Sequence, residues 1–201
     1  MAADSEDTRQ RFRRYIEEHG DVGPVGELAS RLARGELTPA AFDAIVGARP
    51  PTWLKPALLD LLLFYLGGVL SDHRLSIDEQ RTIRELKLLF RVREGEFLRH
   101  RRAEIAVLLA DQLERMLADH QIDDTEALQQ VELQRAFDLS YDEFLALTRP
   151  AVEAEIGRLV DLLEATSSHR AEVMRASSQL EALRTVYLLS STQPRRSGHR
   201  Y

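Results

Sequence analysis

The chain has 201 residues, no cysteine and a formal net charge of −6 at pH 7, from 27 basic and 33 acidic residues. This length can bury a hydrophobic core without covalent cross-links. The lack of cysteine excludes disulfides, thiolate zinc sites and cysteine nucleophiles. Ten glycines and seven prolines are few, and no run alternates between apolar and polar residues as a strand would. We therefore expect an all-α protein.

The N-terminal segment does not resemble a signal peptide. It carries Asp4, Glu6 and Asp7 where such a peptide needs basic residues, and no apolar run follows. The most apolar stretch, residues 57–70, has 14 residues with Asp60 among them, whereas a membrane span needs about 20. We expect a soluble cytoplasmic protein with no membrane insertion.

Capping signals predict where the helices begin and end. Thr38 before Pro39 is typical of a helix start, and Ser76 followed by Glu79 is a capping box, in which the two side chains satisfy free backbone N–H groups. Such signals predict three helices near residues 4–20, 24–35 and 38–47. Four more helices are expected to begin at residue 53 and at the capping boxes 76–79, 123–126 and 140–143. A last helix is expected over roughly residues 169–190.

Proline and composition suggest how the chain is divided. Pro150 is expected to break or kink the helix that begins at Tyr141, with a new helix running to about residue 165. We expect one domain of seven or eight helices. Its parts are an N-terminal helical extension (1–52), a duplicated core (53–165), a C-terminal helix (166–191) and a flexible basic tail (192–201).

The chain matches itself at an offset of 47 residues. Eleven identities fall in the 33 positions 66–98, without a gap. The matched pairs include polar turn residues and the closing aromatics: Asp72 with Asp119, His73 with His120, Glu79 with Glu126, and Phe90 with Phe137. A duplicated helical hairpin whose copies pack about a pseudo-twofold axis is therefore expected.

The two turns, residues 72–79 and 119–126, resemble the TerB-like helical family, which is named for a tellurite-resistance protein. The resemblance covers about residues 53–164. It implies an all-α domain, a role in bacterial stress response, and acidic residues that bind a divalent metal. One departure is that His73 and His120 stand where the family usually has glycine.

The doubled polar residues are the candidate metal ligands. Carboxylate oxygens suit a hard divalent cation, and imidazole would favour zinc or another transition metal. The candidate ligands are Asp72, Glu79, Asp119, Glu126, His73 and His120. The same residues also suit a purely structural role, since aspartate satisfies turn backbone and glutamate completes a capping box. Both interpretations stay open from the sequence, and no other cofactor is indicated.

Other groups of residues have structural and functional readings. Glu96, His100 and Glu104 follow at i, i+4 and i+8, which predicts one helix face, either salt-bridged or metal-binding. Asp60 interrupts an apolar helix, so it needs a partner if it is buried. The aromatic side chains are expected in the core rather than in a binding groove: Trp53, Tyr65, Phe90, Phe97, Phe137 and Phe144.

Charge is unevenly distributed. Residues 103–164 hold 15 acidic and 4 basic residues, whereas residues 165–201 hold 2 acidic and 6 basic ones. An acidic 103–164 face could contact another protein. A sequence pI of about 5.6 argues against a nucleic-acid partner.

No catalytic motif is present: the chain has no P-loop, no Gly-x-Gly-x-x-Gly, no Gly-x-Ser-x-Gly and no His-Glu-x-x-His. We therefore expect a non-catalytic protein-interaction or stress-response module of the bacterial cytoplasm. The alternative is divalent-metal binding or sensing through the paired acidic turns. A metal-dependent enzyme built on the same site is the third.

Overall fold

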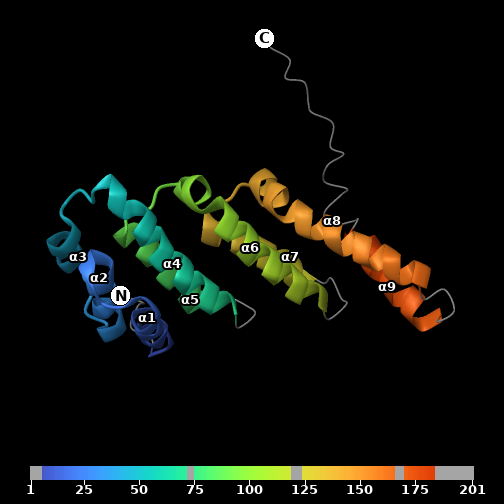
Figure 1. Ribbon diagram of the computed structural model, residues 1–201, viewed down its shortest axis with the longest axis horizontal. Coiled ribbons are helices and arrows are strands. Elements are labelled where there is room, and N and C mark those ends of the chain that lie inside the picture. Colours follow the sequence, from blue (N-terminus) through green and yellow to red (C-terminus); the bar gives the residue numbers. More distant parts are fainter. Residues whose placement is uncertain (1–5, 72–74, 119–123, 166–169, 184–201) are drawn as a thin grey trace, which may run out of the picture. The chain divides into compact units, whose positions relative to one another are not determined.

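The computed structural model describes residues 6–71, 75–118, 124–165 and 170–183, and these ranges contain nine α-helices and no strand. The all-α prediction is confirmed, with more helices than the seven or eight expected. In chain order (Figure 1) the helices are α1 (Glu6–His19), α2 (Gly23–Arg34), α3 (Pro39–Val46), the short 3-10 helix η2 (Thr52–Leu54), α4 (Lys55–Leu70), α5 (Ile77–Leu89), α6 (Glu96–Ala118), α7 (Asp124–Phe137), α8 (Tyr141–Ala165) and α9 (Arg170–Leu183).

The chain forms two compact units. The first comprises Met1–Leu108 with Gln129–Leu139, and the second comprises Leu109–Leu128 with Ser140–Tyr201. Helices α6 and α7 therefore contribute residues to both units. The boundaries expected at residues 52, 165 and 191 stay predictions.

Helix α4 is the centre of the first unit. It packs against α1, α2 and α5, and five of its leucines are fully buried: Leu58, Leu59, Leu61, Leu62 and Leu66. Successive helical residues point about 100° apart, so neighbours such as these cover several sides of the helix. A helix that is apolar on several sides needs partners around it, and α1, α2 and α5 supply them.

One helical stretch in the described ranges, Thr52–Leu70, is long and apolar enough to cross a membrane by composition. It is longer than the 14-residue apolar run because η2 and the start of α4 precede that run. Of its most apolar window, 56% is buried within the chain's own fold, as in the core helix of a soluble protein.

Aromatic packing joins α1 to α4. The Phe12 and Tyr65 rings stack with centroids 5.4 Å apart and an interplanar angle of 8°. Tyr65 is 1% exposed, and its hydroxyl lies 3.4 Å from Thr8 Oγ1. The prediction that Tyr65 belongs to the core is confirmed.

The capping predictions can be compared with the helix ends. Thr38 Oγ1 accepts a hydrogen bond from Ala41 N at 3.1 Å. Ser76 and Glu79 form the complete capping box, and Glu143 likewise accepts from the backbone N–H of Ser140 at 2.8 Å. These three helix starts are confirmed, whereas the cap expected at residue 123 lies outside the described residues.

Pro150 does not end a helix. Helix α8 continues through it from Tyr141 to Ala165, so a break at this position is wrong, and the kink that was the other expected outcome stays a prediction. A proline removes one backbone donor and crowds the preceding turn, which disfavours a helix locally. Here the helix has 25 residues, and the buried residues on both sides of the proline, Leu147 and Val152, support it through packing.

The turn that closes α5 recurs at the end of α7. Arg91 and Asp138 are 47 positions apart, and both have φ of 53°. Val92 N donates to Lys87 O at 2.9 Å, and Leu139 N donates to Gln134 O at 2.9 Å. At this turn the two copies of the 47-residue repeat thus have the same local backbone. Packing of the two hairpins about a pseudo-twofold axis stays a prediction.

In the second unit, α8 packs against α9. Phe144, Leu159 and Leu183 are among its buried residues. Thr148 is also buried, and its hydroxyl donates to the Phe144 carbonyl at 2.9 Å, one turn back along α8. This local hydrogen bond satisfies a hydroxyl that would otherwise be costly to bury.

Candidate functional site

The predicted metal ligands fall mostly outside the described residues. Asp72, His73, Asp119 and His120 lie outside them altogether, and Glu126 lies in α7 with a side chain that is not described. Within the described ranges, no group of three or more histidine, aspartate or glutamate residues is placed to hold a metal ion. The metal site across the paired turns therefore stays a prediction.

Glu79 is the one predicted ligand whose side chain is described. Its Oε2 accepts hydrogen bonds from Ser76 N at 2.9 Å and from Ser76 Oγ at 2.8 Å. Its Oε1 lies 3.7 Å from Arg11 Nη2, which belongs to α1. Both oxygens thus serve the α5 cap and the contact between α1 and α5, as the structural reading of this residue requires.

The Glu96, His100 and Glu104 series does not follow one regular helix face. Helix α6 is kinked at Arg101, whose φ of −137° and ψ of 34° are not helical, so the face changes direction between His100 and Glu104. The expectation that Glu96, His100 and Glu104 share one helix face is wrong. Glu104 instead lies 3.8 Å from the Arg101 guanidinium.

Glu96 begins α6 and connects it to α4. Its Oε2 lies 3.2 Å from Lys55 Nζ and accepts a hydrogen bond from Arg93 N at 2.9 Å. Burial raises the pKa of the Glu96 carboxyl, but the Arg93 N–H and the Lys55 ammonium together outweigh burial and hold that pKa below its usual value. Lys55 also donates to the Arg91 carbonyl at 2.7 Å. This cluster connects the start of α4, the turn after α5 and the start of α6.

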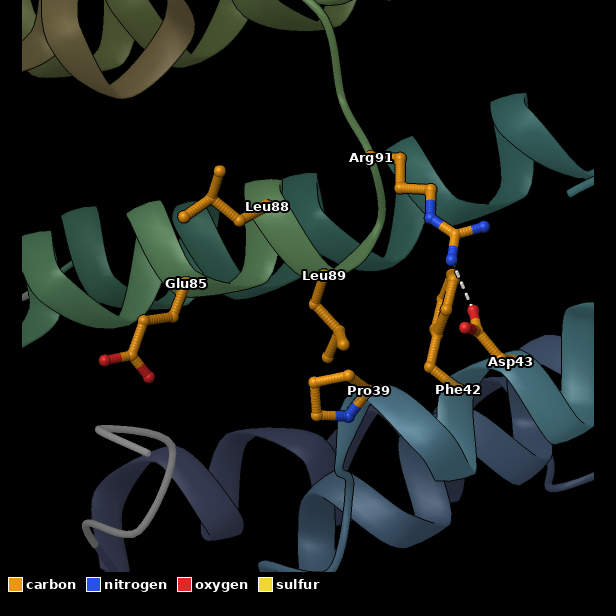
Figure 2. A pocket seen from close by; sticks show the side chains of 7 residues that line it. All are labelled: Pro39, Phe42, Asp43, Glu85, Leu88, Leu89 and Arg91. Carbon is orange, nitrogen blue, oxygen red and sulfur yellow. Dashed lines mark hydrogen bonds and ion pairs between the residues drawn. The ribbon is translucent and has the colours of Figure 1, made fainter. Parts of the chain in front are cut away.

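An apolar pocket lies between α3 and α5. It has a volume of about 290 Å³, and its apolar wall consists of Pro39 and Phe42 from α3 with Leu88 and Leu89 from α5. Figure 2 shows the Leu89 side chain pointing across the pocket toward Pro39. Phe42 is buried, whereas Leu88 is 78% exposed at the edge. The pocket therefore has a packed floor and an accessible apolar rim.

Polar groups mark the two ends of this pocket. At one end, Arg91 donates to a carboxylate oxygen of Asp43 and to the Ala48 carbonyl. Its guanidinium lies 5.7 Å from the centre of the Phe42 ring. At the other end lies Glu85 (Figure 2). The Arg91 contacts hold α3 against the C-terminal end of α5, which keeps the pocket open between them.

Sequence reasoning did not find this pocket. The available signal was the pair Leu88 and Leu89, because the buried face of α5 already holds Ile83, Leu86 and Lys87. A helix with that buried face must turn Leu88 outward. No sequence pattern predicted that α3 would lie opposite α5.

Trp53 was expected in the core, and that expectation is wrong. The side chain is 69% exposed in η2, just before α4. Its neighbour Leu54 is 1% exposed and takes the inward position of this short helix. Three residues per turn leave room for only one buried side chain here.

The acidic stretch 103–164 crosses the boundary between the two compact units. Its residues fall in both compact units, and residues 119–123 lie outside the described ranges. A protein partner on an acidic face stays a prediction.

Comparison of the chain with protein-family models, with curated proteins and with solved structures finds no match. The TerB-like resemblance therefore rests on the two turns alone and stays a prediction.

Proposed function

We propose that this protein is a non-catalytic module that binds a segment of another protein through the pocket between α3 and α5. The observation that carries this proposal is an apolar pocket of about 290 Å³ with Leu88 exposed at its edge. Filling it with an apolar side chain would remove that side chain and the apolar pocket wall from water together, which favours association.

The size and chemistry of the pocket support binding over catalysis. Its volume is at the lower limit of typical small-molecule sites, and it suits one apolar anchor residue. Its lining residues, all of them described, include no histidine, serine or cysteine, and of its two carboxylates Asp43 is paired with Arg91.

Charge suggests what surrounds the anchor. The lining has two carboxylates, Asp43 and Glu85, and one guanidinium, Arg91, which is paired with Asp43. The lining is thus net acidic, with Glu85 at the end away from Arg91. The segment bound would carry an apolar residue with lysine or arginine beside it, because opposite charge at the rim steers association. A bacterial cytoplasmic location and a role in stress response are part of the proposal, on the TerB-like resemblance.

A displayed library of random peptides, selected against the full chain, tests this function. Enriched peptides should share an apolar residue flanked by lysine or arginine, and their affinities can be measured by fluorescence anisotropy. Leu88→Asp places a charge at the rim and should weaken binding at least about tenfold. Glu85→Gln should weaken binding less, and mainly at low salt.

The matched control is Ile77→Asp. Ile77 is 75% exposed on the same helix but does not line the pocket. Its substitution should leave the affinity unchanged. Equal loss of binding in both variants, or a selection that enriches no peptide with an apolar and basic pattern, would contradict the proposal.

A further inference from the structure

A second cavity, of about 470 Å³, lies between α1 and α2 and is lined by three arginines. Arg9 and Arg13 are four residues apart on α1, so they share one face of that helix. Arg34 comes from the last turn of α2. Three arginines from two helices thus line one cavity in the first unit.

The rest of the lining combines one hydroxyl with apolar groups. Ile16 continues the face of Arg13 one turn further along α1. Across from it, Ser30 and Ala33 lie on the face of α2 that also carries Arg34. Ala33 is buried, and Ser30 is partly buried. A ligand here would meet an apolar floor and a hydroxyl as well as positive charge.

The tertiary structure selects these arginines from a larger basic cluster. Of the arginines near the start of the chain, Arg11 lies 3.7 Å from Glu79 on α5, and Arg14 donates to Glu18 at 2.8 Å. Neither of them lines the cavity. Only the face with Arg9 and Arg13 is directed to it.

Nearby carboxylates compensate part of the positive charge. Arg13 donates to Glu6 at 2.8 Å, and Arg34 donates to Glu36 at 2.8 Å. All four of these side chains are more than half exposed. Ion pairs so exposed contribute little to stability, so a better anion can replace either carboxylate. With Glu36 as the one acidic residue in the lining, the cavity has a formal charge of +2.

We propose that this cavity binds a phosphate monoester. A single carboxylate would gain little over the glutamates already present. A phosphate monoester carries a charge of about −1.5 to −2 at neutral pH and has three acceptor oxygens, which matches the charge and the three guanidinium forks. The Ser30 hydroxyl can donate to an ester or phosphate oxygen, and Ile16 with Ala33 can accommodate the carbon part. This inference does not depend on the pocket between α3 and α5.

Isothermal titration of the full chain with O-phosphoserine, in a buffer free of phosphate, tests the site. O-phosphoserine should bind, unphosphorylated serine should not, and inorganic phosphate should bind more weakly because it lacks the carbon part. Arg13→Gln should weaken O-phosphoserine binding about tenfold. Glu36→Gln should strengthen it, because it removes the competing carboxylate from Arg34.

The control is Arg14→Gln, which removes an exposed, ion-paired arginine from the same helix but outside the cavity. It should leave the affinity unchanged. The proposal is overturned if O-phosphoserine gives no heat at millimolar concentration. It is also overturned if Arg13→Gln and Arg14→Gln weaken binding equally, which would show a general charge effect. A phosphoserine peptide that binds no better than O-phosphoserine would assign the site to small phosphate esters, and a tighter one to phosphorylated protein.

Discussion

Arg101 binds both carboxylate oxygens of Asp60. Its Nε donates to Oδ1, and its Nη2 donates to Oδ2 at 2.7 Å and to the Pro56 carbonyl at 3.1 Å. Asp60 interrupts the most apolar helix of the chain, and Arg101 occupies the kink of α6. The aspartate thus has a partner on another helix, and the irregular backbone of α6 coincides with the residue that supplies it.

Replacing Arg101 should destabilise the fold, because the substitution weakens the contact between residue 101 and Asp60. Arg101→Lys keeps the charge but loses the two-pronged contact, and should lower the free energy of unfolding by about 1 kcal/mol. The reduction is modest because the Asp60 side chain is half exposed. Urea unfolding of Arg101→Lys, Asp60→Asn and the double variant measures the coupling energy. Arg102→Lys, at an exposed neighbouring residue, is the control. If the effects of Arg101→Lys and Asp60→Asn on the free energy of unfolding were additive, the pairing would be contradicted.

Lys87 should make stability depend on pH in the alkaline range. The side chain is 8% exposed, and its Nζ lies 2.8 Å from Asp138 Oδ1 and 3.0 Å from the Arg135 carbonyl. Burial lowers the pKa of Lys87, and Asp138 only partly opposes the shift.

The direction of this pH dependence follows from the number of protons that the folded and unfolded states bind. Between its lowered pKa in the folded state and about 10.4 in the unfolded state, the unfolded chain binds more protons at Lys87. Stability should therefore rise with pH through that window. The free energy of unfolding of the native chain minus that of Lys87→Met isolates this effect, because the other titrating groups are common to both. A difference that falls with increasing pH would contradict it.

Two helical glycines should respond oppositely to alanine. A Cβ at Gly26 would lie 2.3 Å from the Asp21 carbonyl carbon, so Gly26→Ala forces the backbone before α2 to move. We expect a loss of about 2 to 3 kcal/mol of stability. A Cβ at Gly157, in α8, would meet nothing within 4 Å. Gly157→Ala should stabilise by up to about 1 kcal/mol through helix propensity alone. Thermal unfolding distinguishes the two, and a similar shift for both variants would contradict the close approach at Gly26.

The fluorescence of Trp53, the single tryptophan, should show how exposed its side chain is. Since its side chain is 69% exposed, its fluorescence should resemble that of tryptophan in water. Acrylamide should quench it nearly as efficiently in the native chain as in urea. A blue-shifted emission protected from acrylamide would return Trp53 to the core position that the sequence suggested.

Local signals predicted much of the secondary structure. The caps at Thr38, Ser76 and Ser140 lie where the sequence predicts them, because a cap is a contact between residues three positions apart and needs no distant partner. The turns at Arg91 and Asp138 also recur, and each is closed by a backbone hydrogen bond between residues five positions apart. Helix α8 does not break at Pro150, because packing on both sides of a residue can outweigh its local preference.

Contacts between residues far apart in the sequence were decided by the tertiary structure alone. Composition, periodicity and capping determined that this chain is all-α and where several of its helices begin. They could not determine that α3 would lie opposite α5 around the apolar pocket, that Arg9 and Arg13 would face α2 while Arg11 faces α5, or that Arg101 would reach Asp60. Each of these contacts joins different helices, and which of their faces meet depends on how all the side chains between them fill space.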